Sequence, residues 1–448
     1  MQTRIEIIAS EFCSSVRDGT HDSPKEVLSG GKPLVTTKHL KSGKIDFDNT
    51  YNISEEDFDK INKRSKVDKW DVLISMIGTV GEVYLVDEEP DYAIKNLGLF
   101  KIGDEIDSKW LYFYLKSKIG QNQIRFLLQG STQQYISLKS LRSFPLFVPN
   151  DDKEKEKIIN FLSALESKIK LNQKMNETLE EIARTLFKSW FIDFDPVRAK
   201  AEGRPTGLSK EISDLFPTSF EESEFGAIPQ GWEVKRLDAV ADFQNGYAFS
   251  SREYVLPNED SKEVFRMGYI ERGGGFKEDN TPVFVPTSSR GNQEKYVLRN
   301  NDLTISMTDM KNNMQILGCC ALIEQDERFL LNQRAGRIRV KESAHISQYY
   351  LYIFMNFPKN IDLLRSRSSS GVQVNLSTST IKETNIILPS KNLSQYFEET
   401  ITPFYQKIFL NNLESKNLKE FRDTLLPKLI SGELKITDAE NLVKEAGI

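Results

Sequence analysis

One set of charged residues in this chain has the types and order of a metal-dependent nuclease site. Pro90-Asp91 is followed by Asp107-Ser108-Lys109, a loose match to the Pro-Asp…Asp/Glu-x-Lys pattern whose carboxylates bind a divalent cation. A pattern this loose arises often by chance. Asp107 or Ser108 also suits the N-cap of a helix predicted over 108–115. We therefore interpret this segment as the start of a helix and not as a catalytic centre.

Other catalytic signatures do not occur in the sequence. A base methyltransferase that uses S-adenosylmethionine needs an Asn/Asp-Pro-Pro-Tyr/Phe block, which Asp193-Phe-Asp-Pro196 does not supply. A nucleotide-driven motor needs Gly-x-x-x-x-Gly-Lys-Ser/Thr, and Gly43-Lys44-Ile45 fails this pattern. The 3 cysteines and 3 histidines are scattered without metal-ligand spacing. We expect a protein that binds and positions, without a cofactor or metal of its own.

Composition describes a globular protein of two or three domains. The chain has 448 residues, of which 39% are hydrophobic and 28% charged. Its apolar runs have the length of strands, so we expect no membrane span, and Met1–Ser10 lacks the features of a secretory signal. The few cysteines favour a reducing cytoplasm. A formal charge of −5 counts against attraction of the whole protein to nucleic acid, although the local charge decides.

The chain repeats itself. Residues 131–149 and 371–389 share residue types at one offset, so that Gln133 corresponds to Gln373 and Pro149 to Pro389. A helical pattern follows each block. A repeat of this length is a duplicated domain with its helix and not a short solenoid unit. Two similar but unequal heads suggest a protein that recognises two different targets at a fixed separation.

Two long amphipathic helices are predicted, each with apolar residues at steps of three and four. Each would be on the order of 60 Å long and needs a partner helix, so mutual packing is the simplest solution. The expected seam consists of Leu162, Leu165, Ile169, Asn172, Leu179, Leu186, Ile401, Phe404, Ile408, Asn411, Leu418 and Leu425. The asparagines place a polar step at the same height in both helices, where it lowers stability but fixes register.

The predicted fold is α+β, with two similar domains joined by two long antiparallel helices in an internal pseudo-twofold repeat. The boundaries are a first head (1–150), a central long helix (151–192), a connector (193–230), a second head (231–390), a distal long helix (391–432) and a C-terminal tail (433–448).

Several segments resemble the DNA specificity subunit of type I restriction-modification enzymes. They are Ser15–His21, Trp70–Gly81, Phe187–Val197, Ile228–Glu233 and Leu425–Leu434, and the resemblance covers nearly the whole chain. It implies two target-recognition domains, each reading one half of a split, asymmetric DNA site. It also implies helices that set the spacing and dock two methyltransferase subunits, through which restriction and motor subunits join. S-adenosylmethionine, ATP and magnesium are then expected on those partners.

Candidate DNA contacts are polar loop residues beside predicted strand ends, because base edges are read by paired donors and acceptors. In the first head these are Lys38, His39, Thr79, Asn96, Ser131, Thr132, Gln133 and Gln134. In the second head they are Arg266, Lys311, Asn312, Asn313, Gln333, Arg334 and Gln373. Arg365 and Arg367, in a predicted serine-rich loop with no acidic residue beside them, are expected to contact phosphates. Gln133 and Gln373 could equally be structural anchors, since both heads share them.

Two other functions remain open at this stage. One is a self-contained DNA-modifying enzyme with a divergent active site, which the purified chain would reveal by turnover. The other is a coiled-coil adaptor whose two domains bind proteins or sugars, a reading that the near-neutral charge favours and that predicts no DNA binding.

Overall fold

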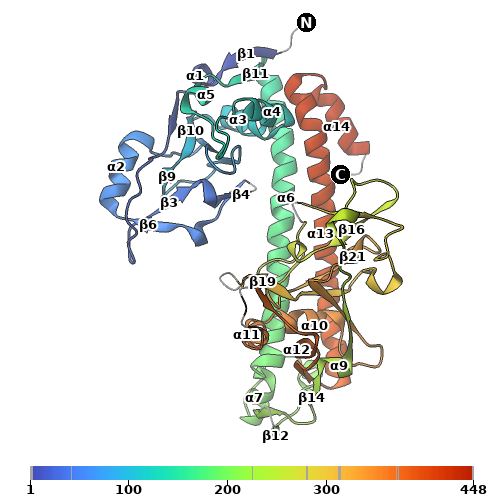
Figure 1. Cartoon of the computed structure of the whole chain (residues 1–448). Coiled ribbons are helices and arrows are strands. Elements are labelled where there is room, and N and C mark those ends of the chain that lie inside the picture. Colours follow the sequence, from blue (N-terminus) through green and yellow to red (C-terminus); the bar gives the residue numbers. More distant parts are fainter. Residues whose placement is uncertain are drawn as a thin grey trace. The chain divides into compact units, whose positions relative to one another are not determined.

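The chain divides into two compact units, each of which contains one head and parts of both long helices. The computed structural model describes residues 4–41, 43–223, 226–278, 281–310, 314–369, 371 and 373–445. Unit 1 is Met1–Gln173 with Asn412–Ile448, and unit 2 is Lys174–Asn411. The long helices α6 (Asp152–Phe187) and α13 (Lys391–Ser431) can be followed in Figure 1.

Unit 1 contains a four-stranded antiparallel sheet next to a three-stranded mixed sheet. The first has the order β2-β10-β7-β8, and in the second β3 lies between antiparallel β6 and parallel β9. A third pair, β1 with β11, joins the two ends of the head. The strands are β1 (Arg4–Ile8), β2 (Ser15–Asp18), β3 (Lys32–Thr36), β4 (Leu40–Lys41), β5 (Lys44–Ile45), β6 (Tyr51–Ile53), β7 (Val72–Ser75), β8 (Val83–Leu85), β9 (Ala93–Lys95), β10 (Leu97–Lys101) and β11 (Pro145–Pro149).

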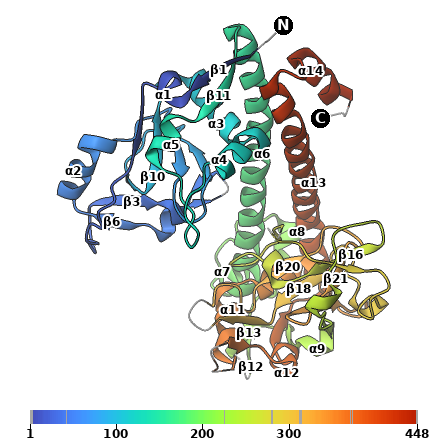
Figure 2. The same ribbon diagram turned by 45° about the horizontal axis from the view of Figure 1, so that its top comes forward.

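The helices of the first head are short, and the most buried of them is α3. Its residues Trp110–Leu115 are all buried, because this run faces both the sheet and α6. The helices are α1 (Ala9–Phe12), α2 (Glu55–Ser65), α3 (Glu105–Lys116), α4 (Lys118–Phe126) and α5 (Leu138–Arg142). Figure 2 shows α3 and α4 beside the part of α6 that belongs to unit 1.

Unit 2 repeats the three main sheets of unit 1. The orders β15-β22-β18-β20, β17-β16-β21 and β14-β24 match the three sheets of unit 1, including the parallel pairing of β16 with β21. The strands are β14 (Glu233–Arg236), β15 (Ala241–Asn245), β16 (Ser261–Phe265), β17 (Phe284–Pro286), β18 (Leu303–Ser306), β19 (Thr308–Met310), β20 (Cys320–Leu322), β21 (Phe329–Leu331), β22 (Ala335–Val340), β23 (Gln373–Asn375) and β24 (Asn385–Leu388). The helices are α9 (Leu237–Val240), α10 (Gln348–Met355), α11 (Pro358–Ser366) and α12 (Thr378–Lys382).

The repeat extends to individual side-chain interactions. In unit 1 the buried Asp71 carboxylate forms a 2.7 Å ion pair with Lys101, and in unit 2 the buried Asp302 pairs with Arg339 at the same distance. Burial raises the pKa of Asp71, and the Lys101 ammonium opposes that rise. A buried carboxylate needs such a partner in order to stay charged, so both heads retain a cation at the equivalent position.

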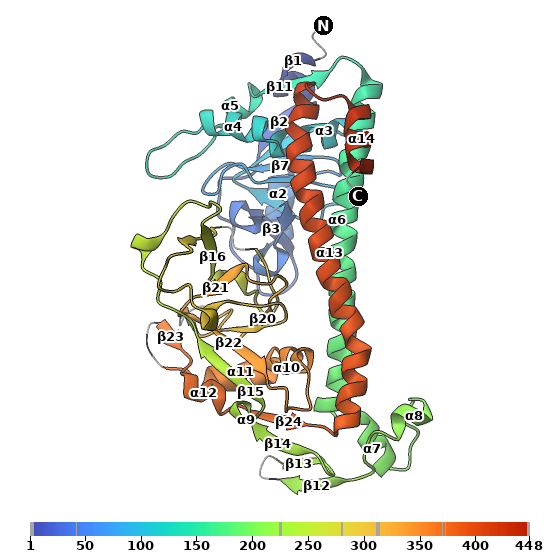
Figure 3. The ribbon, with the colours of Figure 1, turned by 90° about the vertical axis from the view of Figure 1, so that its right-hand side faces the viewer.

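Within unit 1 the two long helices run antiparallel. Leu165 and Ile169 of α6 form one apolar cluster with Leu418 of α13. One turn away, Glu166 accepts hydrogen bonds from Arg422 of α13 (2.5 Å) and Lys116 of α3 (3.1 Å). This carboxylate therefore connects the head to both helices. Figure 3 shows α6 and α13 lying side by side.

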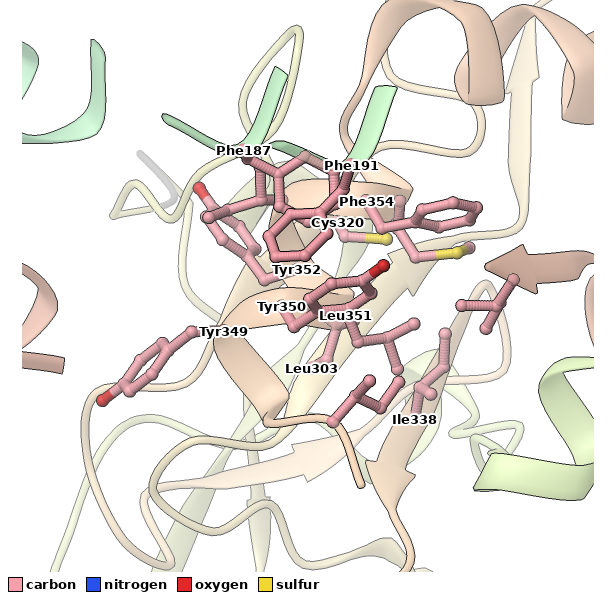
Figure 4. Close-up of a cluster of buried hydrophobic side chains, with 14 of the residues drawn as sticks. Phe187, Phe191, Leu303, Cys320, Ile338, Tyr349, Tyr350, Leu351, Tyr352 and Phe354 are labelled. Atoms are coloured by element: carbon pink, nitrogen blue, oxygen red, sulfur yellow. The ribbon is translucent and has the colours of Figure 1, made fainter. Parts of the chain in front are cut away.

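Within unit 2 the helices pack through aromatic rings. The ring of Phe187 lies 4.9 Å from that of Tyr350 on α10, and Phe191 lies 4.9 Å from Phe397 on α13. Phe191 belongs to a π-helical turn (Lys188–Ile192) that ends α6. Such edge-to-face pairs add about 0.5–1.5 kcal/mol each to the burial of the rings. Figure 4 shows Phe187 and Phe191 above Tyr350 in this core.

The structure confirms the predicted fold class of two α+β heads with two long helices. The predicted helix cap is wrong: Asp104 is the N-cap of α3 and accepts the Asp107 N–H at 2.9 Å. Ser108 lies inside the helix and donates to the carbonyl of Trp70. The sequence signal is ambiguous here because three residues that can cap a helix lie close together.

The connector and the C-terminal tail carry secondary structure that the sequence interpretation did not assign. The connector contains α7 (Asp195–Ala201), α8 (Lys210–Ser213), β12 (Phe220–Ser223) and β13 (Gly226–Pro229). In the tail, α14 (Ile436–Glu445) buries Ile436 and Ala439 in the core of unit 1. No helix in the described part of the chain is long and apolar enough to span a membrane.

Glu166→Gln is expected to lower the free energy of unfolding by about 2–3 kcal/mol, because Lys116 and Arg422 then lose their shared carboxylate while largely buried. Although burial opposes its charge, these two cations lower the pKa of Glu166 below its ordinary value of 4.5. The wild-type advantage is therefore full above about pH 4.5 and decreases as the pH falls through the folded-state pKa.

Urea unfolding of the full chain at several pH values measures this effect. Glu156→Gln, an exposed position on the same helix, is the matched control. Equal stability of the two variants would refute the proposed role of Glu166.

Candidate nucleic-acid interface

In unit 1, the loops that carry most of the predicted DNA contacts meet at one end of the four-stranded sheet. Thr20, after β2, bridges to Lys95, and its carbonyl accepts the Asn96 N–H at 3.2 Å. Ile77, after β7, bridges to Tyr135. These bridges bring Thr79, Asn96 and the exposed run Ser131–Gln134 to the same end of the sheet, where the strands run into loops. Loops that meet at one end of a sheet can present several side chains to one groove of DNA.

Asn96 anchors a polar cluster at this edge. Its φ of 56° lies in the left-handed region, which asparagine tolerates better than other residues with a Cβ. Its Oδ1 lies 2.9 Å from Nδ1 of His21, and Nε2 of His21 lies 3.1 Å from Oδ2 of the buried Asp18. Arg64 also donates to Asp18. The imidazole of His21 is therefore oriented from both sides while its side chain stays 60% exposed.

His21 was not among the predicted contacts, although the segment Ser15–His21 contributed to the family resemblance. Its position after β2 could have indicated the site, since β2 and β10 are neighbours. We add His21 to the candidate contacts of the first head.

Lys38 and His39 follow β3, whose carboxyl end lies beside that of β9. Lys38 is exposed, whereas His39 is buried and its Nδ1 accepts the Thr36 N–H at 3.1 Å. Burial lowers the pKa of His39, so the ring is neutral near pH 7. His39 thus caps the short helix Thr37–His39, and only Lys38 of this pair is free to contact DNA.

Unit 2 has an equivalent edge with different side chains. Gln333 donates its N–H to Tyr247 O at 2.9 Å, and Arg334 O accepts the Met307 N–H at 3.0 Å. β19 and β23 pair there and place Gln373 beside Met310. The side chains of Gln333, Arg334 and Gln373 are exposed. Lys311, Asn312 and Asn313 lie outside the described residues.

The arginines of unit 2 differ in their freedom to bind a ligand. Arg266 donates to Thr281 Oγ1 at 3.1 Å. Arg365 lies in the last turn of α11 and not in a loop, and it donates to Leu317 O and Gln315 O, both at 3.0 Å. Arg367 is exposed directly after that helix. The structure therefore gives Arg365 an anchoring role and leaves the Arg367 guanidinium accessible.

The side chains of the shared glutamines do not serve as anchors among the described residues. Gln133 and Gln373 are both exposed, and their structural contacts are made by the main chain. A Cβ added to Gly130 would lie 2.4 Å from the Gln133 carbonyl oxygen, so the turn itself is tight. A rigid turn that projects a free amide suits base recognition.

Within the residues that the structure places, no three His, Cys, Asp or Glu side chains gather where they could hold a metal ion. Asp107, from the nuclease-like pattern, forms a 2.6 Å ion pair with Lys155.

Comparison with known families assigns the class of this protein. The type I restriction modification DNA specificity domain matches the chain twice, over residues 10–181 and 229–420. Each match contains one head and most of the long helix that follows it, and together the matches cover most of the chain. The chain therefore belongs to the type I restriction-modification specificity family, as the sequence resemblance predicted, and carries two copies of its domain.

Individual relatives agree with this assignment. The HindI specificity subunit of Haemophilus influenzae is 26% identical over 427 residues, which cover 83% of this chain and 88% of the relative. The MjaIX specificity subunit of Methanocaldococcus jannaschii is 26% identical over 348 residues, covering 75% and 71%. The crystal structure of a type I S subunit from M. genitalium has the same fold, with a TM-score of 0.53 at 15% identity, and the match covers 95% of this chain and 96% of that one.

Two neighbouring arginines give a matched test of these roles. Arg365→Ala is expected to lower the free energy of unfolding by about 1–3 kcal/mol, because the carbonyl of the buried Leu317 and the more exposed carbonyl of Gln315 lose a charged donor. Arg367→Ala, on the exposed surface, is expected to change it by less than about 0.5 kcal/mol. Urea unfolding of both variants measures the difference, and similar stabilities would contradict the anchoring role of Arg365.

Proposed function

We propose that this chain is the non-catalytic recognition subunit of a type I restriction-modification complex, and that each head reads one half of a split DNA target. The observation that carries the proposal is the duplicated sheet edge with unequal side chains. Thr79, Asn96 and Ser131–Gln134 occupy the edge in unit 1, where unit 2 presents Gln333, Arg334 and Gln373. Equal scaffolds with different contacts would read two different half-sites.

The chemistry of these side chains suits reading in the major groove. Asparagine and glutamine amides can bond to adenine N6 and N7 together, and arginine can bond to guanine O6 and N7. Each good bidentate pair discriminates against a wrong base by about 1–3 kcal/mol. The unit 1 edge, rich in amides, would therefore favour adenine, and Arg334 would favour guanine in the half-site read by unit 2.

We assign the chemistry to partner subunits. The two long helices would dock two methyltransferase subunits and set the spacing between half-sites, and motor-nuclease subunits would join through these. S-adenosylmethionine, ATP and magnesium would bind those partners and not this chain. Because a base must leave the stack to be methylated, the recognition loops would act on distorted DNA. The reduced, buried Cys13, Cys319 and Cys320 suit a cytoplasmic complex.

Methylome mapping tests the proposal. The chain is co-expressed with the methyltransferase encoded beside it, and methylated bases are mapped across the host DNA. A split motif with two unequal halves, present only when this chain is present, is the expected result. Methylation that is unchanged without the chain, and the lack of a stable complex, would favour a coiled-coil adaptor instead. Turnover by the chain alone would favour a self-contained enzyme.

Arg334→Ala is expected to relax one half of the motif only. Loss of its guanidinium should reduce discrimination at one base pair by roughly 10- to 100-fold, while the other half stays unchanged. Methylation of plasmids with single-base changes across both halves measures this. Gln134→Ala is the reciprocal variant and should relax the opposite half. Equal relaxation of both halves by either substitution would refute the assignment of heads to half-sites.

A further inference from the structure

A half-open pocket of about 300 Å³ lies along one side of α4 in unit 1, outside the candidate contacts described above. It is lined by Lys116, Lys118, Gln121, Asn122 and Arg125. Lys116 ends α3, and the other four residues follow one another on α4 at intervals of three, one and three residues. Residues so spaced share a face of a helix, so the pocket floor is a continuous polar stripe.

The pocket has an excess of positive charge. Lys116 forms a 3.1 Å ion pair with Glu166, and Arg422, which also contacts Glu166, has a second acidic partner in Asp423 at 2.7 Å. Burial opposes the charge of Lys116, but Tyr112 and Glu166 keep its pKa above the ordinary value. Among the described residues, Lys118 and Arg125 have no acidic partner, and Arg125 donates only to Asn122 Oδ1 at 3.3 Å. Two of the three cations that line the pocket, Lys118 and Arg125, therefore lack a neutralising carboxylate within the described part of the chain.

The same helix supports two of the recognition loops of unit 1. Gln121 donates its amide N–H to Gly81 O at 3.0 Å, which fixes the end of the loop that carries Thr79. At its other end α4 leads directly into the loop that carries Ser131–Gln134 (Figure 2). The cationic stripe is thus part of the element that positions the base-reading residues. Phosphate contacts fix the register of a protein on DNA, while base contacts specify sequence.

We propose that this pocket binds a backbone phosphate of the DNA half-site that the first head reads, an inference that rests on the proposed function. The Lys118 ammonium and the Arg125 guanidinium would contact the phosphate oxygens directly. The partly buried Lys116 would supply charge from the base of the pocket. The phosphate would then clamp α4, and with it both loops, in register with the bases.

The second head has different residues at positions related to this stripe, which makes the inference specific. At the positions related to Lys116 and Lys118 it has Asn356 and Pro358, and Arg365 is held by main-chain carbonyls. The two half-sites should therefore differ in their dependence on backbone charge.

The test uses the methyltransferase complex that contains the full chain, and a fluorescent duplex that carries the mapped methylation motif. Lys118→Gln/Arg125→Gln is expected to weaken binding roughly tenfold and to reduce the salt slope, log Kd against log salt, by about 1. The control Lys210→Gln/Lys444→Gln removes the same charge from exposed sites elsewhere and should leave the slope unchanged. Lys118→Arg/Arg125→Lys keeps the charge and should restore binding.

Neutral methylphosphonates placed one at a time along the half-site locate the phosphate. One position should weaken binding by wild type and have no effect on the Gln/Gln variant. The inference would be overturned if the Lys118→Gln/Arg125→Gln variant had the same salt slope as the control variant. It would also be overturned if the variant lost the methyltransferase subunit while its salt slope stayed unchanged. Competition by inorganic phosphate without any methylphosphonate effect would indicate a free-anion site and would also overturn the inference. A missing methylation motif, by contrast, would refute the proposed function itself.

Discussion

A long helix with a continuous apolar stripe cannot bury that stripe alone, and the pairing of α6 with α13 is the constraint on which both units depend. The seam also contains buried amides. In unit 1 Asn172 donates to Glu414 Oε2 at 2.8 Å, and in unit 2 Asn411 donates to Asn176 Oδ1 at 2.8 Å. A slip by one helical turn would separate these partners and bury an amide against leucine or isoleucine, which is costly. The asparagines therefore specify the register that a spacing device requires.

The two heads contact this pair of helices at equivalent positions but through different kinds of side chain. In both units an aromatic side chain bonds to the strand that precedes the long helix: Trp110 Nε1 donates to Phe147 O at 3.1 Å, and Tyr350 Oη donates to Ile387 O at 2.7 Å. At the helix ends the units diverge. Arg4 donates to Leu429 O and Ile430 O at the end of α13, whereas the ring of Trp232 packs at a tilt against that of Phe191 at the end of α6. Arg4 in unit 1 and Trp232 in unit 2 therefore both attach a head to the end of a long helix. The two units share the position of this contact but use different residues to make it.

The sequence predicted the fold better than the site, and the residues explain why. Phe187, Phe191 and Trp232, which carried much of the family resemblance, lie in the core of unit 2, so those motifs report packing. The spacing of apolar residues in the helix seam and the internal repeat likewise follow from burial. Buried positions recur at regular intervals along a helix or strand, so they can be recognised in the sequence. The site depends on which loops meet in space. Arg365 and His39 looked available in sequence but bond to the main chain, while His21 and the α4 stripe appear only once strand order is known.

The net charge of −5 then becomes part of the recognition argument. Phosphate attraction provides nearly all non-specific affinity for DNA, so a strongly basic chain would bind everywhere. An acidic chain whose proposed phosphate contacts lie on α4 and at the strand ends would make few such contacts, and its affinity would depend more on base contacts. Genomic DNA offers very many competing sites, so the ratio of specific to non-specific binding decides occupancy. A sparse set of cations placed beside the recognition loops would improve that ratio at the expense of total affinity.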